Sequence, residues 1–240
     1  MKGFVTMGFV AVLAACTPPA PPATGPAPDP SAPGGTQTPA GPSREAMEAT
    51  AAELRRSTAP ASPRQANFGW SLDEAGARFS GRGVARYVAP RRVRLDLFGP
   101  RGETYLAAAL VDGELRAPPA LLERFELPSP ALLWGAVGVV APPADAALLD
   151  ATTRGDDTTL RYRLGDDVLE YRVSGGRLQT VRRLGRGGGV AESIDLTYNQ
   201  GAQTRAQYRD WAAFRTLILT IESSRDVEQF PEETWRPAGT

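Results

Sequence analysis

The chain has 240 residues, with 27 basic and 27 acidic side chains, no histidine and one cysteine. Without histidine it cannot form a Ser-His-Asp triad, a Cys-His dyad or an imidazole metal site. A single cysteine excludes an internal disulfide and a multi-thiolate metal site, and zero net charge argues against nucleic-acid binding. We therefore expect no catalytic residue, no metal and no cofactor.

Residues 1–15 have the layout of a signal peptide, with Lys2 followed by an apolar run from Phe4 to Val12. The run is too short to remain as a membrane span, which needs about 20 apolar residues. Its ending, Leu-Ala-Ala-Cys, resembles the lipobox of bacterial lipoproteins, so we expect Cys16 to be lipidated. In enteric bacteria an aspartate directly after the lipidated cysteine retains the lipoprotein at the inner membrane. Because Thr17 stands at that position here, we expect the lipid anchor to lie in the outer membrane, facing the periplasm. An ordinary signal peptide that ends near a cysteine is the alternative.

Residues 16–42 follow as a lipidated tether rich in proline, alanine and glycine. Ten of the 26 residues from 17 to 42 are proline, a composition that favours extended polyproline conformations over a packed core. At about 3.1 Å per residue such a segment reaches about 80 Å. It would let an anchored domain meet soluble partners, or serve as a passive spacer.

Residues 43–240 are expected to form one folded domain that begins with a helix and continues as strands. Ser43 is a plausible N-cap, and apolar residues at helical spacing continue to Arg56. After Pro60 the period changes to two, as in strands with one buried side. The alternating apolar sets are Phe68/Trp70/Leu72, Val93/Leu95/Leu97, Leu160/Tyr162/Leu164, Leu169/Tyr171/Val173, Ile194/Leu196/Tyr198 and Leu217/Leu219/Ile221.

Short turn signals separate these sets, so the sheet is expected to be antiparallel. Pro130–Ala141 is a continuous apolar run that Pro142 and Pro143 end, and a short helix on the sheet fits it better than a membrane span. The sequence predicts a mainly β (α+β) fold. About ten strongly curved strands would form an incomplete β-barrel, with the N-terminal helix and the inserted helix over its concave side.

Two blocks carry a family resemblance. Residues 93–104 (VRLDLFGPRGET) and 127–138 (LPSPALLWGAVG) are similar, in order and separation, to segments of the LolA/LolB-like superfamily of lipoprotein localisation factors. Within it they are closest to the outer-membrane receptor, LolB. Phe230-Pro231 and Trp235-Arg236-Pro237 resemble the end of the related carrier. Together these segments anchor residues 70–237.

The resemblance implies a hydrophobic cavity that receives acyl chains of other lipoproteins, a periplasmic carrier as partner, and delivery to the outer membrane. We expect a monomer. The loop expected to face the membrane comprises Phe98, Gly99, Pro100, Arg101 and Gly102; Arg101 stands where the receptor's loop has an apolar residue, usually leucine. The candidate cavity residues are Trp70, Phe79, Tyr87, Leu95, Leu97, Tyr105, Trp134, Leu160, Tyr162 and Tyr171. An ordinary packed core is the alternative for each of these ten.

Other motifs have simpler interpretations. The acidic doublets at 156–157 and 166–167 lie beside glycines in expected turns, where aspartate is common for conformational reasons. The glycine-rich segment 185–189 has strands on both sides and no following helix, so it does not predict a phosphate site. The arginine clusters 91–94 and 182–186 would contact lipid headgroups or an acidic partner, or form solvated faces.

Three functional hypotheses follow from the sequence. The first is an outer-membrane-anchored lipoprotein that binds acyl chains and helps deliver lipoproteins. The second is a non-catalytic sensor or structural envelope lipoprotein on the same scaffold, with a closed core and a protein partner. The third is an enzyme, for which the chain offers no reactive group that we can identify.

Overall fold

The computed structural model describes residues 42–124 and 127–237. The expected signal peptide, the expected lipidation site Cys16 and nearly all of the expected tether lie outside these residues. Within the described ranges, the helices are all too short or too polar to span a bilayer. Residues 41–240 form a compact unit, and it contains the strand pairing and core described below, so we expect it to fold without residues 1–40.

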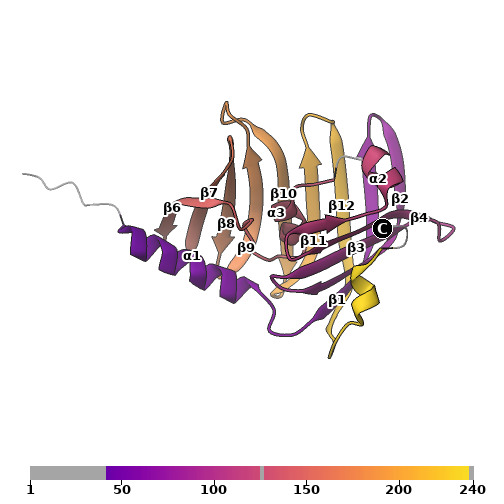
Figure 1. Ribbon diagram of the computed structural model, residues 1–240, viewed down its shortest axis with the longest axis horizontal. Coiled ribbons are helices and arrows are strands. Elements are labelled where there is room, and N and C mark those ends of the chain that lie inside the picture. The colour runs from indigo at the N-terminus through magenta and orange to yellow at the C-terminus, as the bar shows by residue number, and fades with distance from the viewer. Residues whose placement is uncertain (1–41, 125–126, 238–240) are drawn as a thin grey trace, which may run out of the picture. The chain divides into compact units, whose positions relative to one another are not determined.

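Twelve antiparallel strands make up a single sheet (Figure 1). The first five are β1 (Arg64–Glu74), β2 (Ala77–Val88), β3 (Arg92–Phe98), β4 (Thr104–Val111) and β5 (Glu114–Arg116). The other seven are β6 (Ala147–Arg154), β7 (Asp157–Leu164), β8 (Asp167–Ser174), β9 (Arg177–Leu184), β10 (Val190–Asn199), β11 (Ala202–Asp210) and β12 (Arg215–Asp226). The six alternating sets predicted from the sequence fall in β1, β3, β7, β8, β10 and β12.

The strand order is β5-β4-β3-β2-β1-β12-β11-β10-β9-β8-β7-β6. Each strand pairs with the next in the sequence except β5 and β6, which do not pair with each other, and β1 also pairs with β12 and so joins two meanders. Strands β5 and β6 remain as edges, so the curved sheet is an incomplete barrel. The predicted fold class is confirmed.

The N-terminal helix α1 (Arg44–Thr58) begins where the sequence predicts, because the Ser43 Oγ accepts a hydrogen bond from the amide of Ala46 (3.2 Å). It ends two residues later than expected. Only a small part of the helix packs against the core: Ala51 is buried, and Met47 and Leu54 are half-buried. The helix packs beside β6, where the Arg44 Nη1 donates to the carbonyl of Leu148 (3.0 Å).

Helix α3 (Pro130–Ala136) occupies the inner face of the sheet, against β9, β10 and β11. Gly135 allows this close approach: a Cβ there would lie 2.8 Å from Cγ2 of Ile194 and 2.9 Å from Cγ2 of Val181. The apolar run therefore forms a short helix, as predicted, but residues 137–141 leave it. Gly138 turns the chain with φ +79°, a conformation that favours glycine.

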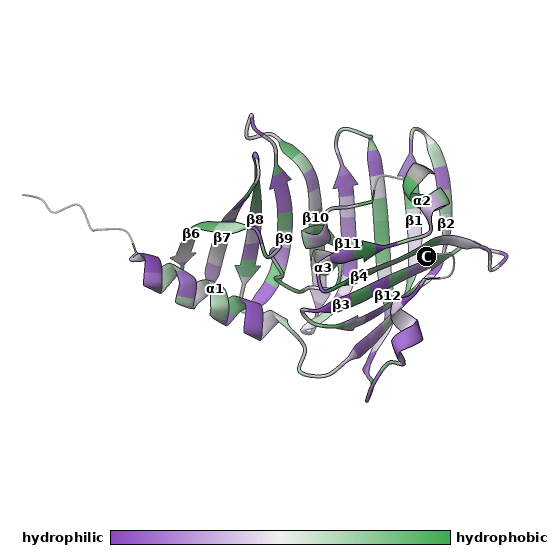
Figure 2. Ribbon diagram, in the orientation of Figure 1, coloured by the Kyte–Doolittle hydropathy of each residue, from purple (hydrophilic) through white to green (hydrophobic). Residues whose placement is uncertain are grey.

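The alternation of side chains produces the core. Bands of apolar and polar residues follow one another along the strands in Figure 2, and the inner-facing residues form one large buried cluster that includes Phe68, Leu160 and Val181. Each is at most 1% exposed. This inner face, together with α1 and α3, is where a ligand cavity could form.

Two short helices were not foreseen. Helix α2 (Pro119–Arg124) follows the edge strand β5, and the 3₁₀ helix η1 (Glu232–Trp235) contacts β3 and β4. Trp235 is buried and packs edge-on against Phe230, with ring centroids 5.6 Å apart. The C-terminal residues that resemble the carrier family thus dock on the sheet face opposite α3.

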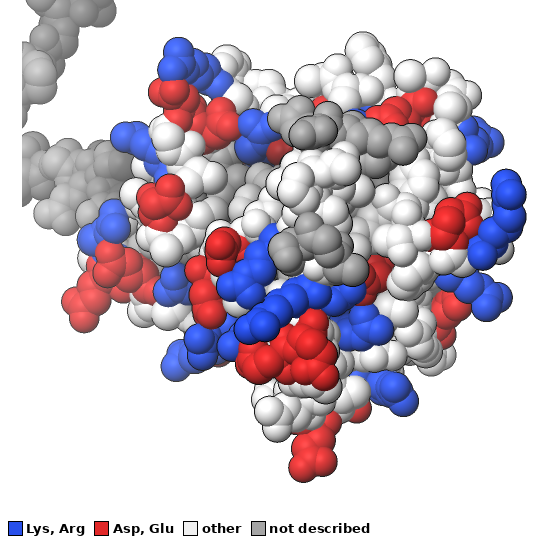
Figure 3. Space-filling view, turned by 45° about the vertical axis from the view of Figure 1, so that its right-hand side comes forward, with Lys and Arg blue, Asp and Glu red and all other residues white. Residues whose placement is uncertain are grey.

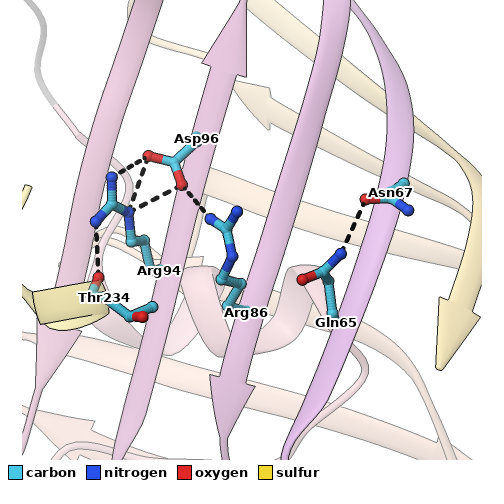
Figure 4. Close-up of polar contacts among 6 residues, drawn as sticks. All are labelled: Gln65, Asn67, Arg86, Arg94, Asp96 and Thr234. Atoms are coloured by element: carbon cyan, nitrogen blue, oxygen red, sulfur yellow. Dashed lines mark hydrogen bonds and ion pairs between the residues drawn. The ribbon is translucent and has the colours of Figure 1, made fainter. Parts of the chain in front are cut away.

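A buried carboxylate fixes this C-terminal segment (Figure 4). Asp96 is 2% exposed and accepts hydrogen bonds from Nε and Nη2 of Arg94 (2.9 and 2.8 Å) and from Nη1 of Arg86 (2.7 Å). The Arg94 Nη1 also donates to the carbonyl of Thr234 (2.7 Å). The ion-pair cluster therefore connects β2 and β3 to η1.

Candidate functional site

The ten candidate cavity residues are mostly buried. Eight of them are 7% exposed or less, while Tyr105 is half-buried and Phe79 is 40% exposed. The eight are Trp70, Tyr87, Leu95, Leu97, Trp134, Leu160, Tyr162 and Tyr171.

A cavity of about 350 Å³ lies on the inner face, between the ends of α1 and α3 and strands β1, β2 and β12. We call it the tyrosine cavity, because Tyr87 and Tyr198 contribute to its wall. Much of the remaining lining is apolar. That part comprises Ala66, Phe68, Ala85, Ala136, Val137, Ala202, Leu219 and Ile221. Its volume is at the lower end of the range for small-molecule sites, about 300–1,000 Å³.

Polar groups lie at the border of the tyrosine cavity. The Tyr198 hydroxyl donates to the carbonyl of Leu178 (2.7 Å), and the Arg177 guanidinium carbon lies 6.0 Å from the Tyr198 ring centroid. Gln203 donates from Nε2 to the carbonyl of Ala136 at the end of α3 (2.8 Å). The cavity can therefore accept an amphiphile, with apolar strand residues for a chain and polar groups for the part that stays near water.

Burial gives the cavity tyrosines a testable pH dependence. Desolvation raises the pKa of Tyr198 to about 12, and it also raises the pKa of Tyr87. An unfolded tyrosine titrates near pH 10, so above that pH the unfolded chain loses protons that the folded chain retains. We expect the free energy of unfolding to fall as the pH rises from about 10 to 12. Urea titrations across this range test it, and Tyr198→Phe should make the fall shallower.

Two smaller spaces extend along the inner face. A gap of about 10 Å³ lies beneath α3 and shares Ala136 and Val137 with the tyrosine cavity. A space of about 60 Å³, which we call the rim cavity, is lined mainly by apolar residues at the other end of β1 and β12. Its lining comprises Leu72, Leu97, Tyr105, Leu106, Leu127, Pro128, Tyr208, Arg215 and Leu217.

A hollow of about 500 Å³ beside α2 is larger, and a buried carboxylate forms part of its wall. Arg86, Arg94 and Asp96 contribute to its wall, and these are the groups that form the ion-pair cluster. A chain of methylene groups gains nothing from a charged lining. Arg64 and Arg177 also border the tyrosine cavity, but it lies on the inner face against Phe68 and Leu219 and is therefore the better candidate for an apolar ligand.

The structure divides the ten candidate residues among these spaces. Tyr87 lines the tyrosine cavity, and Leu95 lines the gap beneath α3. Leu97 and Tyr105 line the rim cavity. The others belong mainly to packed clusters, with Trp70, Leu160, Tyr162 and Tyr171 in the largest one and Trp134 beside Tyr87 and Val139. Phe79 lies on the surface, with its ring centroid 5.6 Å from that of Tyr105.

Sequence reasoning missed much of the wall of the tyrosine cavity. Ala66 and Ala85 make room because they are small, and they face each other across β1 and β2. Arg177 is the first residue of β9 and Gln203 the second residue of β11, outside the alternating sets. The period-two pattern did mark Tyr198, but a residue pattern does not separate a cavity wall from a packed core.

The core beneath α1 contains two tyrosine hydroxyls without a hydrogen-bond partner among the described residues, those of Tyr162 and Tyr171. Their rings pack edge-on with centroids 5.9 Å apart. A buried hydroxyl left unpaired costs about 1–3 kcal/mol. We therefore expect Tyr171→Phe to raise the free energy of unfolding by about 1 kcal/mol or more. Urea denaturation measures this, and a loss of stability would mean that the hydroxyl does have a stabilising partner.

The other motifs have local roles. Asp166 and Asp167 pair with Arg186 and Arg183, respectively, and segment 185–189 closes the β9–β10 turn. Arg91, Arg92 and Arg94 each have a carboxylate partner. Basic and acidic side chains accordingly alternate on the face shown in Figure 3. Within the described ranges, His, Cys, Asp and Glu form no group suited to a metal ion.

The loop expected to face the membrane forms a compact turn between β3 and β4. The amide of Gly99 donates to the carbonyl of Glu103 (2.8 Å), and that of Gly102 donates to the carbonyl of Gly99 (3.0 Å). Phe98 and Gly99 are half-buried, while residues 100–102 are exposed. The loop therefore presents Arg101 to solvent rather than an apolar side chain.

Comparison with known proteins identifies the fold. No family model and no curated protein sequence matches the chain. A LolA superfamily protein from Nitrosomonas europaea aligns with a TM-score of 0.54 at 13% identity, over 79% of this chain and 96% of that one. A putative outer membrane lipoprotein-sorting protein domain from Vibrio parahaemolyticus aligns with a TM-score of 0.50 at 13% identity, over 80% and 96%. The chain thus has a LolA-like fold.

Proposed function

We propose that this protein binds the acyl chains of lipoproteins or lipids in the tyrosine cavity and helps deliver them to the outer membrane. The observation that carries the proposal is a cavity of about 350 Å³ with both apolar and polar residues in its wall, on the inner face of a LolA-like sheet. The likeness to a putative outer membrane lipoprotein-sorting domain supports the same assignment.

Burial of methylene groups supplies the affinity. Each buried CH₂ contributes about 0.8 kcal/mol, so burying about ten methylenes against residues such as Ala66, Ala85 and Leu219 would contribute about 8 kcal/mol, the free energy of a micromolar complex. The gap of about 10 Å³ beneath α3 is too small for further methylenes, so the rest of a longer chain would leave through the open side of the tyrosine cavity. The polar groups at Arg177 and Tyr198 would then lie near the head of the ligand.

The role of an anchored receptor rests on the N-terminal sequence. Acylation of Cys16 would attach the protein to the outer membrane on its periplasmic side, and residues 16–42 would let the domain meet a soluble carrier. The two sequence blocks at 93–104 and 127–138 support the LolB type over the soluble LolA type.

A sensor or structural lipoprotein with a closed core is the second candidate. The specific observation in its favour is the dense packing beneath α1, where Leu160, Leu169 and Tyr171 have no measurable exposure. Such a protein would act through a protein partner and bind no acyl chain.

Native mass spectrometry distinguishes the two candidates. Residues 41–240 would be purified without the anchor and mixed with a synthetic dipalmitoylglyceryl-cysteine peptide, with the unacylated peptide as control. A stoichiometric adduct with the acylated peptide alone, or co-purified lipid that this peptide displaces, supports acyl binding. An apo mass that neither peptide changes supports the closed core.

A further inference from the structure

Exposed aromatic side chains gather at one end of the sheet. Among the described residues, five large hydrophobic side chains are strongly exposed. Leu122 lies on α2 and Leu149 on β6. The other three are Phe79 (40%), Trp211 (53%) and Phe214 (83%), and all three belong to two neighbouring hairpins.

The strand register places these two hairpins side by side. Strand β11 ends at Asp210 and β12 begins at Arg215, which pairs with Glu74 at the end of β1. The β11–β12 turn is therefore next to the β1–β2 turn, and Figure 1 shows both tips at the top of the sheet. We call this the hairpin end.

The β11–β12 turn is built to hold its aromatic residues outward. The Asp210 Oδ1 accepts hydrogen bonds from the amides of Ala212 and Ala213 (3.0 Å each), and the amide of Trp211 donates to the carbonyl of Ala191 (3.0 Å). Phe214 has φ +50°, in the left-handed region that a bulky side chain rarely adopts. Such strain, combined with the exposure of a phenylalanine to water, points to a functional contact.

The hairpin end borders the rim cavity. Arg215, the neighbour of Phe214, lines that cavity, as does Tyr105, whose ring contacts Phe79. The exposed aromatic residues are thus next to the apolar residues that line the rim cavity on the inner face.

The charges at this end are largely paired. Arg215 lies 2.5 Å from Glu74, and Arg78 lies 3.2 Å from Asp73. Arg209 pairs with Asp195 (3.0 Å), and its guanidinium carbon lies 6.0 Å from the Trp211 ring centroid. The local surface therefore combines protruding aromatic rings with nearly balanced charge.

We propose that Trp211, Phe214 and Phe79 insert into the interface of a zwitterionic bilayer and bring the rim cavity to the membrane surface. The inference rests on the proposed function, and because the rim cavity lies at the opposite end of β1 and β12 from the tyrosine cavity, the contact would orient the domain on the membrane. Tryptophan is enriched at membrane–water interfaces, and a convex aromatic turn suits a soft bilayer. It also supplies the apolar contact that Arg101 does not provide in the β3–β4 loop.

Tryptophan fluorescence tests the proposal with little background. Of the four tryptophans, Trp211 is exposed, whereas Trp70, Trp134 and Trp235 are at most 3% exposed. Residues 41–240 with an N-terminal histidine tag would be tethered to phosphatidylcholine–phosphatidylethanolamine vesicles through a nickel-chelating lipid. Brominated phosphatidylcholine should quench the emission, and Trp211→Phe should remove the quenched component while tethering persists.

Affinity without the tether provides a second measurement. Phe214→Ser should lower partitioning into the same vesicles by about tenfold, and high salt should change it by no more than about twofold because the charges are paired. Thr220→Ser, an exposed change on β12, is the matched control. The urea midpoints of all variants should match the unmodified domain, since each changed side chain is exposed.

Each other outcome has a definite meaning. If brominated lipid leaves the emission of Trp211 unchanged in the tethered protein, the proposed membrane contact is wrong. It is also wrong if Trp211 is shielded by formation of a dimer in solution and not by vesicles. If quenching fails while the acylated peptide still binds, the proposed function stands without this contact. If quenching occurs and the peptide does not bind, the contact stands and acyl binding fails.

Discussion

Replacing Ile221 by tryptophan is expected to lower the affinity for the acylated peptide by about a hundredfold. Ile221 is half-buried on β12 and lines the tyrosine cavity. An indole ring there would occupy the space of several methylenes, each contributing about 0.8 kcal/mol, and a loss of about 3 kcal/mol is about a hundredfold. Titration of residues 41–240 with the dipalmitoylglyceryl-cysteine peptide measures the change.

Thr220→Trp is the matched control for this substitution. Thr220 precedes Ile221 on β12 and is exposed, so the same ring would lie in solvent on the other face. Its affinity should remain within about twofold of the unmodified domain, since exposed changes seldom alter free energies by more than about 0.5 kcal/mol. Equal affinities of both folded variants would contradict binding in the tyrosine cavity.

Asp96→Ala is expected to have the largest effect on stability, a loss of about 3–5 kcal/mol. The carboxylate is nearly inaccessible and accepts hydrogen bonds from Arg86 and Arg94, and its removal leaves two largely enclosed guanidinium groups without their anion. Because Arg94 also holds the carbonyl of Thr234, we expect η1 to detach. Urea denaturation gives the free energy, and fluorescence of Trp235 reports the detachment.

Asp226→Ala provides the comparison for Asp96. Asp226 pairs with Arg64 (2.9 Å) across β12 and β1, but both side chains are more than one-third exposed. Surface ion pairs contribute about 0–1 kcal/mol, so this variant should be close to the unmodified protein. A similar small loss for both aspartates would mean that the Asp96 cluster does not stabilise the fold.

Local patterns account for how much of the fold could be predicted. Ser43 marked the first helix because a hydroxyl before a helix satisfies a free amide, and alternation such as Leu160, Tyr162 and Leu164 marked strands with one buried face. Strands without clean alternation escaped notice. In β4, residues 106–111 are buried on both faces, because η1 covers the outer face, and no local pattern foretells that contact.

The candidate site was harder to predict for a related reason. Whether Tyr171 is core and Tyr198 a cavity wall depends on where α1 and α3 lie, and both residues belong to sets with the same period-two pattern. The cavity exists where Ala66 and Ala85 leave volume that neither helix fills. Small residues on a strand look like weak strand formers, so their role is visible only once β1, β2 and β12 are placed together.

The most direct test of acyl binding in the tyrosine cavity is photo-crosslinking with a dipalmitoylglyceryl-cysteine peptide that carries a diazirine on one acyl chain. After irradiation with residues 41–240, digestion and mass spectrometry locate the modified residues. We predict crosslinks at the residues that line the tyrosine cavity, in segments 57–60, 64–68, 136–138, 176–177, 198–203 and 219–224 and at Ala85 and Tyr87. Crosslinks confined to the hollow beside α2 or to outer surfaces, with none in these segments, would contradict the account.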